Sequence, residues 1–145
     1  MVAGYKISSD PKQMDLSVIH GYLAGSYWAK GVPLSTMQTA INNSFCFGVF
    51  TEAGQQVAFA RMITDYATSA YLADVFVLPE HRGKGLSKWL VQTIIDHPQL
   101  QGLRRMLLVT SDAHNLYRKF GFSALASPEL FMELHRPNVY QTLKE

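Results

Sequence analysis

The sequence has a single cysteine, Cys46, among its 145 residues. One cysteine excludes an intrachain disulfide and any metal site built from several cysteines. Cys46 lies in an apolar run from Ser44 to Phe50, without a His, Asp or Asn partner at a recognisable spacing. We therefore interpret it as a core residue and not as a nucleophile.

The sequence also has no large excess of charge of one sign and no long apolar run. The net charge is +2, which gives no strong attraction to nucleic acid or to an anionic membrane. Polar residues such as Arg61 and Asp74 interrupt the apolar stretches, which stay far below the ~20 apolar residues that span a bilayer. Residues 1–10 lack the apolar segment and cleavage site of a secretory signal. We expect a soluble, cytoplasmic protein with neither nucleic acid nor membrane as its partner.

The overall composition is that of a globular protein. Hydrophobic residues make up 48% of the chain and charged residues 17%, and there is no internal repeat, low-complexity tract or linker. A chain of this length can bury one core but not two independent ones. We therefore expect a single domain over residues 1–145, with one functional site.

The order of apolar patterns predicts a mixed α/β sheet. Helical spacing and caps predict helices over 16–24, 35–41 (with Ser35 as N-cap), 86–97 and 113–120 (capped by Asp112). Runs rich in β-branched and aromatic residues predict strands over 5–8, 45–51, 56–64, 70–78, 106–110, 122–125 and 130–134. The order of strands and helices is that of one mixed sheet flanked by helices.

The most informative segment runs from Asp74 to Leu90, where a buried strand passes through a glycine turn into a helix. Such a turn aims free backbone N–H groups at one point, and the helix dipole adds positive potential there, so it suits a pyrophosphate. Gly83 and Gly85 do not have the spacing of a P-loop, and Lys88 stands where a dinucleotide fingerprint needs glycine. A glycine turn that only allows close packing is the remaining alternative.

Two local motifs resemble those of the GNAT acetyltransferase superfamily. The stretch from Val77 to Ser87 is similar to its coenzyme A motif: Arg82 and Gly85 match, and Ser87 replaces the usual Gly or Ala. About 25 residues later, Ala113, the pair Leu116-Tyr117 and the pair Gly121-Phe122 resemble its second signature. Two signatures in the expected order are much less probable by chance than either alone.

The resemblance implies an acetyl-CoA-dependent N-acetyltransferase that uses no metal. Its fold would be a mostly antiparallel central sheet flanked by helices, with the fourth and fifth strands splayed apart. The N–H of Val75 would polarise the thioester carbonyl, and Phe76 or Val77 would pair with the pantetheine arm. Tyr117 would act as general acid, since a phenol with a pKa of ≈ 10 is protonated at neutral pH. Pyrophosphate would bind backbone N–H groups of Arg82, Gly83, Lys84, Gly85, Leu86 and Ser87.

The sequence gives weaker signals for a general base and for the acceptor substrate. Ala73 occupies the position where polyamine-acetylating relatives carry a glutamate, and Asp74 could be a base or a structural carboxylate. Asp65, Glu80, His81 and His114 have no diagnostic spacing. We therefore hypothesise direct attack by a primary amine, in a ternary complex, with no single essential base.

The aromatic pair Tyr27 and Trp28 could wall an acceptor pocket or cover a core edge. The resemblance leaves open a regulatory domain that binds coenzyme A without catalysis, and a transferase of another acyl group or acceptor. Because superfamily members are often dimers, it also allows a homodimer.

Overall fold

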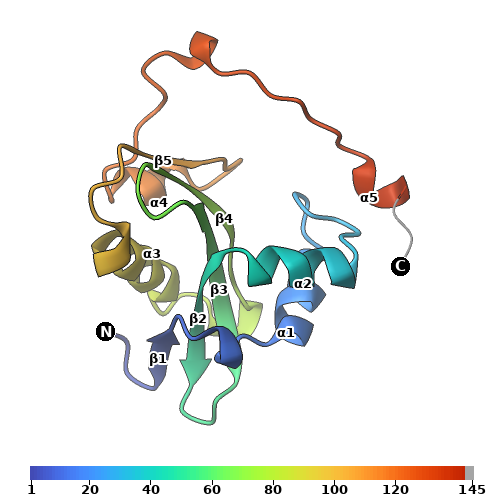
Figure 1. Cartoon of the computed structure of the whole chain (residues 1–145). Coiled ribbons are helices and arrows are strands. Elements are labelled where there is room, and N and C mark those ends of the chain that lie inside the picture. Colours follow the sequence, from blue (N-terminus) through green and yellow to red (C-terminus); the bar gives the residue numbers. More distant parts are fainter. Residues whose placement is uncertain (143–145) are drawn as a thin grey trace.

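A computed structural model describes residues 1–142. Five strands form one sheet in the order β1-β2-β3-β4-β5, and neighbouring strands are antiparallel except for the parallel pair β4–β5. This confirms the mixed, mostly antiparallel sheet with flanking helices (Figure 1). The strands are β1 (Tyr5–Ser8), β2 (Phe45–Thr51), β3 (Gln56–Thr64), β4 (Ser69–Val77) and β5 (Arg105–Leu108).

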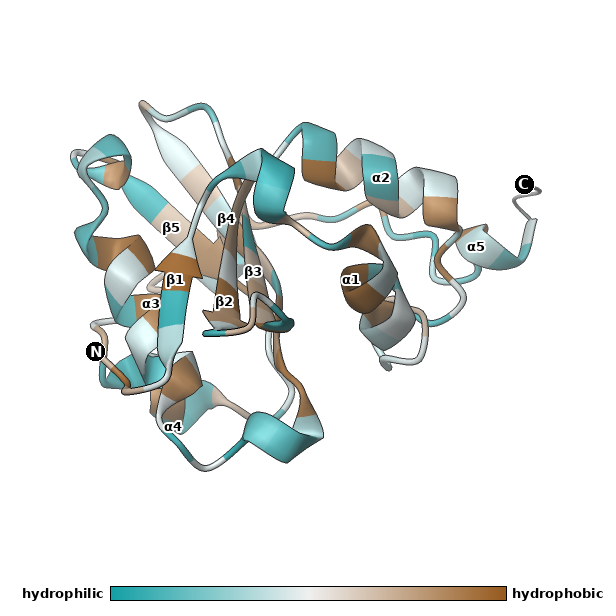
Figure 2. Ribbon diagram, turned by 90° about the horizontal axis from the view of Figure 1, so that it is seen from below, coloured by the Kyte–Doolittle hydropathy of each residue, from teal (hydrophilic) through white to brown (hydrophobic). Residues whose placement is uncertain are grey.

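Helices cover both faces of the sheet, because each face carries its own apolar cluster. Helices α1 and α2 pack on one face around Ile19, Leu23 and Phe59. Helix α3 and the short α4 pack on the other, around Leu90 and Ile94, as Figure 2 shows. The helices are α1 (Leu16–Leu23), α2 (Leu34–Asn42), α3 (Leu86–Asp96), α4 (His114–Arg118) and α5 (Val139–Thr142). Within residues 1–142 no helix is long and apolar enough to cross a membrane.

The predicted C-terminal strand pair is wrong. Residues 122–138 contain no strand in the structure, only a 3-10 turn at Pro128–Leu130, and they run away from the sheet as an extended arm (Figure 1). A strand pattern becomes a strand only when another strand supplies its hydrogen bonds. Within residues 1–142 the arm forms no ladder with a strand of the sheet.

Two helix caps also differ from the prediction. Helix α2 begins after Pro33 and not after Ser35, and α4 begins after Ala113 and not after Asp112. In the second case the hydroxyl of Thr110 accepts the N–H of Ala113 at 3.1 Å and so takes part in the turn.

Candidate functional site

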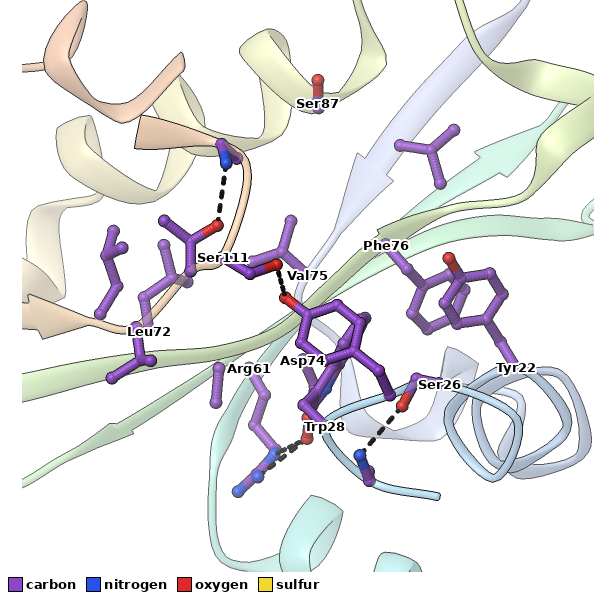
Figure 3. Close-up of a pocket in the computed structure, with 18 of the residues that line it drawn as sticks. Tyr22, Ser26, Trp28, Arg61, Leu72, Asp74, Val75, Phe76, Ser87 and Ser111 are labelled. Carbon is purple, nitrogen blue, oxygen red and sulfur yellow. Dashed lines mark hydrogen bonds and ion pairs between the residues drawn. The ribbon is translucent and has the colours of Figure 1, made fainter. Parts of the chain in front are cut away.

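A cleft opens where β4 and β5 separate. The two strands pair over only four residues each, from Ser69–Arg105 to Leu72–Leu108. Beyond Leu72 the strands diverge and leave a cleft of about 1170 Å³. It lies between the second half of β4, the loop after β5, the α1–α2 loop and the start of α3 (Figure 3). The expected splaying of the fourth and fifth strands is therefore present.

A β-bulge distorts β4 where it borders the cleft. Phe59 pairs with Phe76 and Arg61 with Ala73, so Ala60 faces two residues, Asp74 and Val75. Asp74 has φ of 57°, a left-handed conformation that is uncommon outside glycine. Because a bulge leaves its extra residue outside the ladder, main-chain groups next to Val75 are released from β3.

Main-chain groups of Val77 face the cleft side of β4. The N–H of Leu78 donates to the carbonyl of Val57 at 2.8 Å, which makes Val57 and Leu78 a hydrogen-bonded pair. In an antiparallel ladder such pairs alternate with pairs whose groups point outward. The main-chain N–H and C=O groups of Val77 therefore point away from β3, whereas those of Phe76 point toward it. This favours Val77 over Phe76 as the residue whose main chain can hydrogen-bond a ligand.

The turn after β4 supplies further N–H groups at the end of the cleft. Gly83 and Gly85 have φ of 78° and 81°, conformations that few residues other than glycine adopt. Gly85 is the N-cap of α3, and among residues 1–142 no side chain caps that end. The first N–H groups of a helix have no intrahelical acceptor, so those of Leu86 and Ser87 are available to an anion.

The predicted residues of this turn differ in whether their side chains line the cleft. Gly83, Arg82 and Ser87 line the cleft, whereas the side chain of Lys84 is exposed outside it. The Leu86 side chain is only 2% exposed and belongs to the core, so only its main chain could contact a ligand.

Arg82 connects the turn to β4 and to α1. Its Nε donates to the carbonyl of Val77 at 2.9 Å, and its Nη2 donates to the Tyr22 hydroxyl at 3.0 Å. The Tyr22 ring stacks on Phe76, with centroids 4.2 Å apart, and Figure 3 shows the two side by side. Sequence reasoning missed Tyr22, because nothing local indicates that α1 meets this turn.

Tyr117 is a buried phenol on the cleft wall. Its side chain is 8% exposed and lines the cleft, and it meets Phe122 edge to face at 5.8 Å. Burial raises the pKa of Tyr117 above its ordinary value, and Tyr27 and Asp112 raise it further. The phenol therefore holds its proton well into the alkaline range.

Asp74 is engaged in a structural ion pair. Its Oδ2 lies 2.8 Å from Nη2 of Arg61 and accepts the Nε–H of Arg61 at 2.9 Å, while its Oδ1 accepts the Trp28 indole N–H at 2.9 Å. Figure 3 shows Trp28 and Arg61 converging on this carboxylate. Both carboxylate oxygens of Asp74 are thus engaged by donors of its own chain. The geometry therefore favours a structural role for Asp74 over a role as general base.

The other base candidates lie elsewhere. Of Asp65, Glu80, His81 and His114, none lines the cleft in the described part of the chain. His81 shares a hydrogen bond of 2.7 Å with the Tyr5 hydroxyl. Asp65 accepts four hydrogen bonds from residues 67–69, which hold the pKa of its carboxyl far below its usual range.

Aromatic side chains form the remaining end of the cleft. Tyr27 and Trp28 meet edge to face at 5.0 Å, and the Ser111 hydroxyl donates to that of Tyr27 at 2.7 Å. Asp112 and Tyr140 of α5 also line this end, and neither was predicted as a site residue. The exposed carboxylate of Asp112 lies on a loop, and Tyr140 follows the arm that the sequence predicted as strands.

No group of three or more His, Cys, Asp or Glu side chains within residues 1–142 is arranged to hold a metal ion.

The chain therefore has a sheet that opens between a parallel pair of strands, with a bulge on one side and a glycine turn leading into a helix. Residues 15–122 match the Acetyltransferase (GNAT) family. The chain belongs to this family and is accordingly an acyltransferase.

Relatives from distant organisms agree with this assignment. A crystal structure described as a GNAT-family acetyltransferase from Xanthomonas campestris is 50% identical, with a TM-score of 0.93 over 97% of this chain and 99% of that one. A Gibberella zeae protein named as an acetyltransferase is 34% identical over 79% of this chain and 76% of its own length. A Clostridium acetobutylicum acetyltransferase solved with acetyl-CoA is 17% identical and shares the fold, with a TM-score of 0.65 over 90% of this chain and 94% of that one.

Proposed function

We propose that this protein transfers an acetyl group from acetyl-CoA to a primary amine by direct transfer within a ternary complex. The observation that carries the proposal is the cleft itself, which has free N–H groups at the α3 turn, outward main-chain groups on β4 and a protonated phenol on its wall.

The residues of the α3 turn fit a pyrophosphate. A side chain at Gly83 or Gly85 would meet nothing within 4 Å, so the space in front of the turn is open to a ligand. The backbone N–H groups from Arg82 to Ser87 would hold the phosphates, supported by the dipole of α3. Val77 on β4 would hydrogen-bond the pantetheine arm, and the N–H of Val75 would orient the acyl carbonyl.

When bound, acetyl-CoA supplies a thioester whose acyl carbon forms a C–N bond with the amine while the C–S bond breaks. Tyr117 would donate its phenolic proton to the departing sulfur, because its raised pKa keeps it protonated at neutral pH. The amine would lose its proton to water, since Asp74 is occupied by Arg61 and Trp28.

Thermal unfolding with and without acetyl-CoA tests the cofactor. A ligand at 100 times its Kd stabilises the native state by about 2.7 kcal/mol, so we expect a clear rise in Tm. Gly85→Glu should abolish the rise, because a carboxylate would stand where the phosphates bind. Gly102→Glu is the matched control: its φ is also 81°, and it lies in the loop before β5 and not in the turn before α3. If wild type shows no rise at saturating acetyl-CoA, the proposal is wrong.

Screening primary amines for release of free coenzyme A thiol then tests catalysis. A regulatory domain that only binds coenzyme A would show the Tm rise but no thiol release with any amine. A different acyl specificity would appear as faster release from another acyl-CoA.

A further inference from the structure

The end of the cleft formed by Tyr27, Trp28 and the loop after β5, here called the acceptor end, has apolar side chains in solvent. Tyr27, Trp28 and Val109 all line the cleft, and they are 67%, 42% and 81% exposed. Large apolar side chains that gather in solvent around a cleft usually mark a surface that a ligand covers. The acceptor end therefore suits a ligand with an apolar group.

The two aromatic rings of the acceptor end are held in place by their polar tips. The indole N–H of Trp28 donates to Asp74 of β4 at 2.9 Å, and the Tyr27 hydroxyl accepts the Ser111 hydroxyl at 2.7 Å. Figure 3 shows Trp28, Asp74 and Ser111 on three different segments of the chain. Side chains that are already fixed lose little further freedom when a ligand packs on them. Because aromatic side chains favour ring partners, the pair suits a ligand ring.

The acceptor end has no cationic side chain to spare for a ligand. Within residues 1–142 the Arg and Lys side chains that line the cleft are Arg61 and Arg82. Arg61 is paired with Asp74, and Arg82 lies in the turn proposed to bind the phosphates, where it donates to the Val77 carbonyl. A phosphate or carboxylate group on the acceptor would therefore be desolvated here without a partner of opposite charge.

Asp112 provides an unpaired negative charge at the acceptor end. Its side chain is exposed and lines the cleft, and in the described part of the chain its carboxylate has no hydrogen bond or ion pair. The neighbouring hydroxyls are engaged, that of Ser111 with Tyr27 and that of Thr110 with the N–H of Ala113. The free side chain among these three is thus an anion, which attracts an ammonium group and repels a carboxylate or a phosphate.

Asp112 and Tyr27 also lie near the proposed proton donor. Burial, and then Tyr27 and Asp112, raise the pKa of the Tyr117 phenol, and a neighbouring group has such an effect only over a short distance. All three residues line the same cleft. An ammonium group beside Asp112 would therefore lie near the sulfur that Tyr117 is proposed to protonate.

We propose that the acceptor is an aromatic monoamine whose ammonium group pairs with Asp112 and whose ring packs on Tyr27 and Trp28. This inference rests on the proposed acetyl transfer and names its substrate class. A cation beside the ring faces gains a further attraction from their π electrons. An acceptor with an anionic group lacks a partner at this end, and a polyamine would leave the rings uncovered. Asp112 is a binding residue in this scheme, and the amine still loses its proton to water.

Isothermal calorimetry in the presence of coenzyme A tests the binding without turnover, because coenzyme A carries no acetyl group to transfer. Three probes separate the ring from the charge: phenethylamine, phenylpropanoate, which has the same ring with a negative group, and diaminobutane, which has two positive charges and no ring. We expect phenethylamine to bind at least tenfold more tightly than the other two. Equal affinity for either of them, or no binding of phenethylamine, would overturn the proposal.

Substitutions at Asp112 and Tyr27 test the two contacts. Asp112→Asn should weaken phenethylamine binding at least tenfold, because it removes the charge and keeps the shape. Asp96→Asn is the matched control and should bind like wild type: Asp96 is exposed at the last position of α3, whereas the cleft-lining Ser87 is near the first. Tyr27→Ala should weaken binding more than Tyr27→Phe, which keeps the ring and loses only the bond to Ser111. Unchanged affinity in Asp112→Asn, or equal affinities of the two Tyr27 variants, would contradict the assigned contacts.

The test of the acceptor class can fail separately from that of acetyl transfer. A rise in Tm with acetyl-CoA and thiol release with other amines, without binding of phenethylamine, would refute the aromatic acceptor and leave acetyl transfer standing. No rise in Tm at saturating acetyl-CoA would refute acetyl transfer, and the acceptor class with it.

Discussion

Arg61 and Asp74 form an ion pair across the bulge of β4, in which one carboxylate oxygen, Oδ2, lies 2.8 Å from Nη2 of the guanidinium and accepts its Nε–H at 2.9 Å. Their side chains are 14% and 8% exposed. The pair lies where Ala60 opposes two residues of β4, and Asp74 is held at φ of 57°. The ion pair therefore stabilises the distortion that opens the ladder beside Val75.

Replacing Asp74 with Asn should destabilise the fold without removing the chemistry. Removing one partner of a buried pair leaves an uncompensated charge and costs about 3 kcal/mol, measured as a lower urea midpoint. Thiol release by the folded variant should fall less than tenfold, because in the proposed mechanism the amine loses its proton to water and not to Asp74. A loss of many hundredfold with an intact fold would instead make Asp74 the base.

Replacing Tyr117 with Phe should lower kcat by roughly 10²–10⁴-fold, the range for a lost general acid. The Kd for acetyl-CoA should be unchanged, because the phenyl ring keeps its packing against Phe122. Steady-state thiol release and ligand-induced Tm shifts measure the two effects separately. Tyr66→Phe, on an exposed loop outside the cleft, is the control. Equal rates for Tyr117→Phe and wild type would contradict the assigned role.

The raised pKa of Tyr117 predicts how stability changes at high pH. The folded state keeps the phenolic proton above the pH at which the unfolded chain loses it, near 10. Above that pH the native state binds more protons than the unfolded state, so the free energy of unfolding falls as pH rises. Urea titrations between about pH 9 and 11 should show a steeper fall for wild type than for Tyr117→Phe. If the free energy of unfolding changed with pH equally in the two proteins, burial would not raise the pKa of Tyr117.

Cys46 should be unreactive in the native protein. Burial raises the pKa of its thiol to about 11, with Arg61 opposing and Asp74 adding to the shift, and only the thiolate is a strong nucleophile. A chromogenic disulfide reagent at pH 8 should therefore label Cys46 only in denaturant. Ser44→Cys, half-buried two residues earlier, offers a more accessible thiol for comparison. Rapid native labelling of Cys46 would show that the site is open to solvent.

The sequence alone predicted the central part of the fold and the residues of the α3 turn. Runs rich in β-branched and aromatic residues predict β2 to β4, because such side chains favour an extended backbone. The turn at Gly83 and Gly85 can be predicted because its conformation is a local property of the backbone. Tyr117 can be predicted as a site residue because it lies within a short sequence signature. These features depend on neighbours within about ten residues.

Tertiary structure alone decided the rest. The role of Asp74 depends on Arg61 and Trp28, which are 13 and 46 residues away, and the place of Tyr22 depends on α1 meeting a turn 60 residues later. The preference for Val77 over Phe76 follows from the ladder register. The arm shows the limit most clearly: Leu130, Met132 and Leu134 have a strand's alternation, but a strand's hydrogen bonds are made with another segment, and the local pattern does not supply that segment.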